Sequence, residues 1–170
     1  LGHLWKDYVS MTPQAEDIRE LLAERGEVFE NDHIALRTFN LEAVSLRKLS
    51  LPFLGLGYQF TGEYHFEKKK LYARSYSHPS GKFPRIFISE LLTEEFSDEF
   101  QATVKSIVDE LPEKVTASQL LQAQNIWPKV SFEDYSSLLQ ESEYGAWLAA
   151  FGIRANHFTV SVNALKSFGN

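Results

Sequence analysis

Two histidines and one arginine carry the strongest chemical signal in the sequence, because they lie in segments that alternate like β-strands. His33 opens the segment His-Ile-Ala-Leu-Arg-Thr-Phe, and Arg37 follows four residues later. His157 lies on the polar face of a second alternating segment, residues 156–163. Since residues two apart in a strand share a face, His33 and Arg37 point the same way, about 13 Å apart. Such a pair suits a ligand held by a metal ion at one end and by a guanidinium fork at the other.

A simpler interpretation is that His33 is a hydrogen-bonded histidine and Arg37 a surface ion-pair partner. For either residue taken alone, this structural interpretation is favoured. His157 changes the balance, because two histidines leave room for a carboxylate and open positions. That is the ligand set of non-haem iron(II) enzymes. The sequence has no cysteine, so any metal must use histidine and carboxylate, which favours iron, manganese or zinc.

The two histidine segments also resemble one another, which indicates a duplicated module. Each begins with asparagine and histidine and ends in an asparagine that could cap a helix, Asn40 in the first and Asn163 in the second. The alternative is chance similarity between two short strands. If the repeat is real, two modules packed side by side would bring both histidines into one cleft, and the chain reaches only the first turn of its second copy.

The carboxylate that would complete such a site is less clearly placed. Glu90 ends a strand-like segment and is a candidate ligand. It alternates with Ile86 and Ile88, however, so we expect it on their apolar face, which favours a structural role. In a duplicated fold, the equivalent glutamate of the second module would lie beyond Asn170.

The remaining pattern predicts an α+β domain built around one βαβββ module. A helix is expected from Leu41 to about Leu51, capped by Asn40 and ended by Pro52. We expect residues 1–170 to form a single, incomplete domain with four parts: N-terminal helices at 1–27, the first βαβββ module at 28–92, a helical insertion at 93–152 and the start of a second module at 153–170.

Composition and charge exclude several classes of protein. The chain is 44% hydrophobic and 24% charged, as in an average globular protein, which excludes a disordered or low-complexity segment. A net charge of −6 argues against a nucleic-acid binder, and the basic run Lys68–Lys70 is more readily a solvated hairpin tip than a phosphate clamp. We expect neither nucleic acid nor a membrane as a partner, and a cytoplasmic location by default.

The histidine segments resemble the signatures of a known family. Asn31–Phe39 and Asn156–Val162 are similar to the two histidine motifs of the 2-oxoadipate dioxygenase/decarboxylase family, which is related to the glyoxalase/vicinal-oxygen-chelate fold. Leu4–Val9, Met11–Pro13 and Arg85–Leu91 also resemble that family.

This resemblance implies an iron(II)- and O₂-dependent conversion of 2-oxoadipate to 2-hydroxyglutarate in lysine catabolism. On the matching positions, His33 and His157 would bind iron and Arg37 would bind the 2-oxoacid substrate. The family's third ligand is a glutamate later in the domain that no position here matches, so it is expected beyond Asn170. Two alternatives stay open. One is another metal-dependent enzyme of the same fold, such as a glyoxalase-type isomerase or a ring-cleaving dioxygenase, and the other is a non-catalytic binding module.

Overall fold

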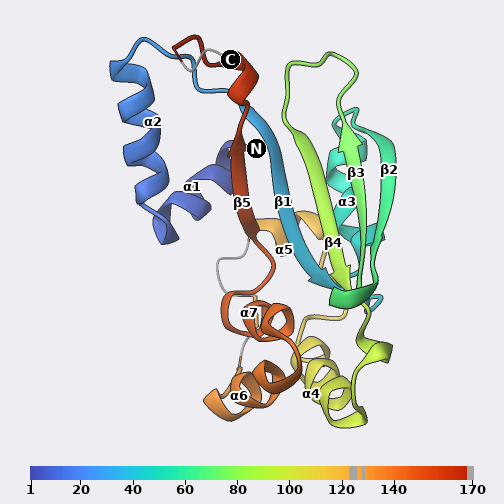
Figure 1. Cartoon of the computed structure of the whole chain (residues 1–170). Helices are drawn as coiled ribbons and strands as arrows, with labels where there is room; N and C mark the ends of the chain where they lie inside the picture. The colour runs from blue at the N-terminus through green and yellow to red at the C-terminus, as the bar shows by residue number, and fades with distance from the viewer. Residues whose placement is uncertain (123–125, 128, 168–170) are drawn as a thin grey trace.

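The computed structural model describes residues 1–122, 126–127 and 129–167. Within those residues, a five-stranded sheet in the order β2–β3–β4–β1–β5 forms the centre of the molecule (Figure 1). Its strands are β1 (Asn31–Phe39), β2 (Gln59–Phe66), β3 (Leu71–Ser77), β4 (Arg85–Leu91) and β5 (Ala155–Val160). β1 and β4 run parallel, whereas the other neighbouring pairs run antiparallel. This mixed architecture confirms the predicted α+β class.

The helices lie in three groups around the sheet. They are α1 (Gly2–Met11), α2 (Gln14–Glu24), α3 (Leu46–Gly55), α4 (Asp98–Asp109), α5 (Ala117–Gln122), α6 (Phe132–Glu141) and α7 (Glu143–Phe151), with short 3-10 helices η1 (Glu67–Lys69), η2 (Thr93–Glu95) and η3 (Val162–Ala164). α1 and α2 lie beside β5, α3 and α5 lie behind the sheet, and α4, α6 and α7 gather at one end (Figure 1). None of the described helices combines the length and the apolar character needed to cross a bilayer.

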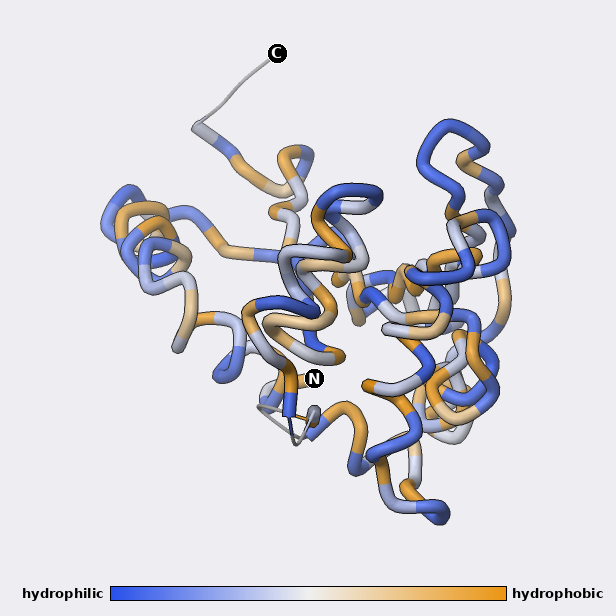
Figure 2. The backbone as a smooth tube through the Cα atoms, turned by 90° about the horizontal axis from the view of Figure 1, so that it is seen from below, coloured by the Kyte–Doolittle hydropathy of each residue, from blue (hydrophilic) through white to orange (hydrophobic). Residues whose placement is uncertain are grey.

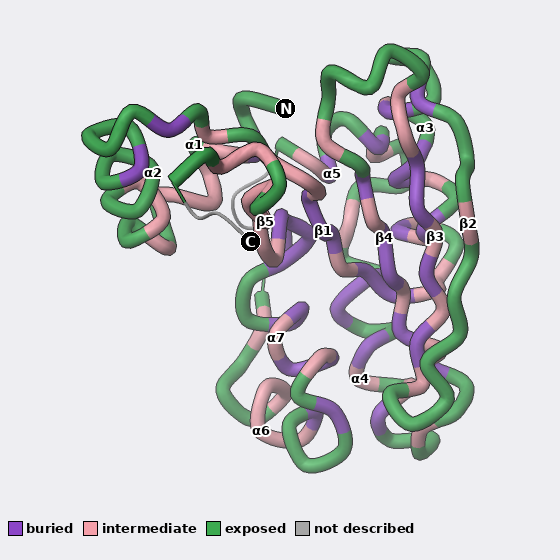
Figure 3. The backbone as a smooth tube through the Cα atoms, turned by 45° about the horizontal axis from the view of Figure 1, so that its top comes forward, coloured by how far each residue is buried: buried purple, intermediate pink, exposed green. Residues whose placement is uncertain are grey.

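The two faces of the sheet differ in chemistry because side chains alternate along each strand. One face carries Ile34, Leu36, Ile86 and Ile88, which are all buried in the hydrophobic core that α3 also contributes to. Burial is greatest in the central strands and small in the edge strand β2 (Figure 3). Hydrophobic and hydrophilic residues alternate over short distances along the chain (Figure 2), as expected when each element has one buried side. The opposite face of β1 and β4 is left for the site described below.

The helix predicted from Leu41 to about Leu51 begins and ends later than expected, at Leu46 and Gly55. Ser45 is the N-cap, and its hydroxyl accepts a hydrogen bond from the backbone N–H of Lys48. Residues 41–44 form a turn instead, which the Thr38 hydroxyl holds by donating to the carbonyl of Val44 at 2.5 Å. Pro52 lies inside the helix rather than ending it.

The two asparagines predicted as helix caps have other roles. The side-chain oxygen of Asn40 accepts hydrogen bonds from the backbone N–H and the hydroxyl of Thr93, at 3.1 and 2.8 Å, so it stabilises the turn after β4. Asn163 lies within η3, whose N-cap is Ser161, and β5 ends at Val160 rather than at residue 163. Both capping predictions are therefore wrong. Thr93 binds the side-chain oxygen that Asn40 would need as a cap, and Asn163 lies inside the short helix rather than before it.

The back of β5 packs against the N-terminal helix. Phe158 meets Trp5 edge-on, with ring centroids 5.1 Å apart, and Tyr8 at 5.0 Å. A nearly buried ion pair joins Arg154 to Asp7 at 3.5 Å. These contacts hold the strand that carries His157, since Phe158 and His157 point to opposite faces.

Gly152 joins α7 to β5 in a conformation that other residues rarely adopt, with φ 75° and ψ −166°. A Cβ atom added there would lie 2.7 Å from Cγ2 of Ile126. We predict that Gly152→Ala lowers the free energy of unfolding by about 1–3 kcal/mol from backbone strain alone. Gly55→Ala is the matched control, because nothing lies within 4 Å of its added Cβ. Urea unfolding of both variants checks this, and equal effects would contradict it.

Candidate metal and substrate site

The two histidines predicted to share a cleft lie on adjacent strands. β1 and β5 pair antiparallel, with His33 opposite Thr159 and His157 opposite Ala35. The Nε2 atoms of His33 and His157 are 3.2 Å apart, and their ring centroids are 5.3 Å apart. The predicted adjacency is thus confirmed, whereas a role in metal binding stays a prediction.

Both imidazoles are held from behind through their Nδ1 atoms. Nδ1 of His33 lies 2.8 Å from Oδ2 of Asp32 and 2.8 Å from the hydroxyl of Thr159. Nδ1 of His157 lies 3.0 Å from Oδ1 of Asn156. A proton on each Nδ1, donated to these oxygens, leaves a lone pair on each Nε2. Metal-binding histidines are typically oriented by such partners.

The ionisation states suit the same interpretation. Burial, with a smaller contribution from His33, lowers the pKa of His157, which keeps its ring neutral at neutral pH. The hydrogen bond with His33 and the guanidinium of Arg85 hold the pKa of Asp32 below its usual value. Arg85 lies 3.1 Å from Oδ2 of Asp32 and so fixes that carboxylate in turn.

The donor set therefore fits a transition metal of the borderline class. With both protons on Nδ1, the two Nε2 atoms carry lone pairs and cannot hydrogen-bond to each other, and a cation between them relieves the repulsion. Among the residues with described positions, no cluster of three or more histidine or carboxylate side chains surrounds such a point. In that part of the chain the site consists of two histidines.

Glu90, the candidate carboxylate, does not join the histidines. It pairs in register with Thr38, on the sheet face opposite to that of His33. Its Oε2 accepts a hydrogen bond of 2.8 Å from the backbone N–H of Leu46, at the start of α3. Burial raises its pKa. This placement agrees with the structural role that the alternation with Ile86 and Ile88 favoured, so we leave Glu90 out of the site.

Arg37 lies on the same face as the histidines. Its guanidinium is half-buried, and desolvation lowers its pKa without removing its charge. The guanidinium carbon lies 4.8 Å from the ring centroid of Tyr144 and 5.0 Å from that of Trp147, both in α7. In the described part of the chain no carboxylate forms an ion pair with Arg37, so its charge is free to meet an anionic ligand.

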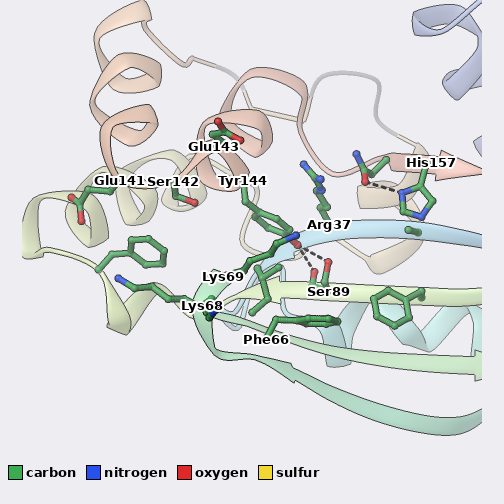
Figure 4. Close-up of a pocket in the computed structure, with 16 residues that line it drawn as sticks. Arg37, Phe66, Lys68, Lys69, Ser89, Glu141, Ser142, Glu143, Tyr144 and His157 are labelled. Carbon is green, nitrogen blue, oxygen red and sulfur yellow. Dashed lines mark hydrogen bonds between the residues drawn. The ribbon is translucent and has the colours of Figure 1, made fainter.

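His157 and Arg37 line a common pocket of about 500 Å³. Its wall runs from His157 past Ala35 and Arg37 to Lys69 (Figure 4). The basic run Lys68–Lys70 lies at the hairpin tip between β2 and β3, and all three lysines line this pocket. Ala35 leaves space between the histidine end and the arginine end because its side chain is only a methyl group.

Several residues of the site are missed by sequence reasoning. Asp32 could have been noticed as the neighbour of His33, since carboxylates often orient metal-binding histidines. Tyr144 and Trp147 lie one helical turn apart on α7, but nothing in the sequence says which strand that turn faces. Thr159 becomes informative only once the register between β1 and β5 is known.

The sheet and its helices define a protein of the α+β class. A solved protein from Ralstonia eutropha, described as belonging to the glyoxalase superfamily, shares this fold with a TM-score of 0.79 and 23% identity over 92% of this chain and 59% of its own. The sequence model of the family described as 2-oxoadipate dioxygenase/decarboxylase matches residues 6–170. The chain therefore belongs to the 2-oxoadipate dioxygenase/decarboxylase family.

Individual relatives agree with this assignment. The chloroplastic 2-oxoadipate dioxygenase/decarboxylase of Arabidopsis thaliana is 31% identical over all of this chain and 50% of its own length. Hydroxyglutarate synthase from Oryza sativa, solved in complex with 2-oxoadipate, has a TM-score of 0.90 and 32% identity over 97% of this chain and 57% of its own. A solved Shewanella frigidimarina protein, described only as a hydrolase, has a TM-score of 0.91 and 45% sequence identity over 99% of this chain and 66% of its own length. The chain spans about half the length of the curated relatives it matches.

We predict that Asp32→Ala weakens metal binding by about 10–100-fold, because His33 loses the acceptor that orients its ring. Anaerobic calorimetric titration with iron(II) measures this. Glu30→Ala is the matched control, since it removes an exposed carboxylate two residues away and should leave the affinity unchanged. An equal loss in both variants would mean that only overall charge matters.

Glu90→Gln tests the structural role of that residue. The raised pKa means that the folded state holds the Glu90 proton more tightly than the unfolded state, whose ordinary value is 4.5. Ionisation therefore reduces stability as pH rises above that value. Gln keeps an oxygen for the N–H of Leu46 but carries no charge, so stability at pH 7 should be equal or higher and metal affinity unchanged. Thermal melts and iron(II) titration check this, and weaker metal binding would make Glu90 a ligand.

Proposed function

We propose that this chain supplies two iron(II) ligands, His33 and His157, and the substrate-binding Arg37 of a 2-oxoadipate dioxygenase/decarboxylase. The reaction would convert 2-oxoadipate and O₂ to 2-hydroxyglutarate and CO₂, a step of lysine catabolism, in the cytoplasm. The observation that carries the proposal is the sheet face on which the Nε2 atoms of His33 and His157 meet at 3.2 Å, beside a guanidinium that has no carboxylate partner among the described residues. His157 and Arg37 line the same pocket. The 2-oxoadipate bound in the rice hydroxyglutarate synthase supports the choice of substrate.

Each residue has a separate task in this proposal. His33 and His157 would hold the metal through Nε2, together with a carboxylate ligand expected beyond Asn170. Iron(II), when bound, would supply the one-electron chemistry that lets O₂ react with an organic acid. Arg37 would bind the distal carboxylate of the substrate with two parallel hydrogen bonds.

The spacing along β1 suits this division. His33 and Arg37 are four residues apart, which is about 13 Å in a strand. A metal–ligand bond of about 2 Å at one end and a hydrogen bond of about 3 Å at the other leave room for an extended six-carbon acid. The methyl side chain of Ala35, between the two ends, gives that chain space to lie against the strand.

The proposal is tested by oxygen uptake and CO₂ release. With iron(II) added, the longest natural form of the protein that contains these residues should consume one O₂ and release one CO₂ for each 2-hydroxyglutarate formed. The 170-residue chain alone should bind iron(II) weakly and turn over little, because two imidazoles leave the ion's charge poorly neutralised. Isomerisation without O₂ uptake would instead favour a glyoxalase-type enzyme, and absence of metal binding a non-catalytic module.

Arg37→Lys tests the substrate-binding role. Lysine keeps the charge but loses the planar fork, so one charge-assisted hydrogen bond is lost. We expect KM for 2-oxoadipate to rise by roughly one to two powers of ten, which corresponds to about 1.5–3 kcal/mol. The same substitution should hardly change the affinity for 2-oxohexanoate, which has a methyl group in place of the distal carboxylate. Unchanged kinetics with 2-oxoadipate would remove Arg37 from the site.

A further inference from the structure

Arg37 meets two aromatic rings from one turn of α7. The rings of Tyr144 and Trp147 both lie within 5.0 Å of the guanidinium carbon. Residues three apart in a helix share a face, so a single turn presents both rings to β1. Trp147 is braced from behind by Phe151, whose ring centroid lies 5.4 Å away. The side chain of Tyr144 reaches towards the strand that carries Arg37 (Figure 4).

The Tyr144 hydroxyl fixes this turn to the strand pair that carries Arg37. It donates to the carbonyl of Ser89 at 2.8 Å, lies 2.9 Å from the Ser89 hydroxyl and accepts from the N–H of Thr38 at 3.3 Å. Ser89 pairs in register with Arg37 across β1 and β4. The ring under the guanidinium is therefore tied to the backbone at the same level of the sheet. Burial raises the pKa of Tyr144, which keeps the hydroxyl protonated and able to donate.

We infer that Tyr144 and Trp147 form an aromatic clamp that positions the Arg37 guanidinium for an anionic ligand, and that this clamp sets the preference for dicarboxylic over monocarboxylic 2-oxoacids. Contacts with ring faces use none of the five N–H donors, so the whole fork is left for a carboxylate. A side chain ordered before the ligand arrives loses less freedom on binding. A carboxylate partner in place of the rings would order Arg37 equally well, but it would cancel the charge that the ligand needs.

This inference rests on the proposed function for its choice of ligands, so its test has two parts. The first part needs no ligand. In the labelled protein, the Nε–Hε resonance of Arg37, identified by its loss in Arg37→Lys, should be shifted upfield by the ring currents of the clamp. Trp147→Leu should reduce the shift, and Trp147→Phe should keep most of it. A resonance at the position of an exposed arginine in the unsubstituted protein would overturn the clamp.

The second part compares binding of 2-oxoadipate and 2-oxohexanoate to the iron(II)-loaded, full-length protein without oxygen. Trp147→Leu should weaken the binding of 2-oxoadipate by roughly 3–10-fold, which is the range of a partly buried cation–π contact. It should leave the affinity for 2-oxohexanoate nearly unchanged. Trp147→Phe should retain most of the affinity for 2-oxoadipate that Trp147→Leu loses. Phe132→Leu is the control, because it removes an exposed ring of α6 whose ring neighbour is Tyr135.

The outcomes separate the two ideas. If Trp147→Leu weakens both acids equally, or neither, the clamp has no positioning role and the inference falls while the proposed function stands. If the unsubstituted protein binds no 2-oxoacid, the proposed function falls, and the ring-current shift alone decides whether the clamp exists. Thermal melts of all variants exclude a loss of binding that follows from unfolding.

Discussion

The pairing of β1 with β5 is the constraint on which the site depends. His33 and His157 are 124 residues apart in the sequence, and only this antiparallel pair brings their Nε2 atoms to 3.2 Å. A shift of one residue in the register would turn one histidine to the other face of the sheet. The packing of Phe158 on Trp5 and Tyr8 resists such a shift, because it would move an aromatic ring from behind the strand into the pocket. The contacts behind β5 are therefore part of the metal-site geometry.

The same strand pair accounts for what could be predicted from the sequence. Alternation identified the faces of His33, Arg37 and Glu90, because a strand's period of two depends on local geometry alone. The predicted start of the helix after β1 is too early, because Asn40 is a good cap in isolation. In the structure, Thr93, from a turn more than fifty residues away, donates hydrogen bonds to the side-chain oxygen of Asn40. Propensities describe a segment by itself, and the competing partner came from elsewhere in the chain.

The aromatic clamp was beyond sequence reasoning for a related reason. The three-residue spacing of Tyr144 and Trp147 indicates a shared helical face, but such a face normally packs into an apolar core. Its actual neighbour is Arg37, a charged residue on a strand more than a hundred positions earlier. The Tyr144 hydroxyl donates to the carbonyl of Ser89 and accepts from the N–H of Thr38, and these bonds help to fix which strands the turn meets. Contacts of this kind follow from the packing of α7 against β1, which no local pattern encodes.

The register between β1 and β4 also explains why no carboxylate of β4 neutralises the charge of Arg37. Arg37 pairs with Ser89, and Glu90 pairs with Thr38, one residue further along. Because faces alternate, that one-residue offset puts the only nearby carboxylate of β4 behind the sheet, where the N–H of Leu46 stabilises it. Serine, which carries no charge, lies beside the arginine and bonds to Tyr144 instead. The sheet thus separates two opposite charges that would otherwise neutralise each other, and it leaves the positive one facing the pocket that His157 also lines.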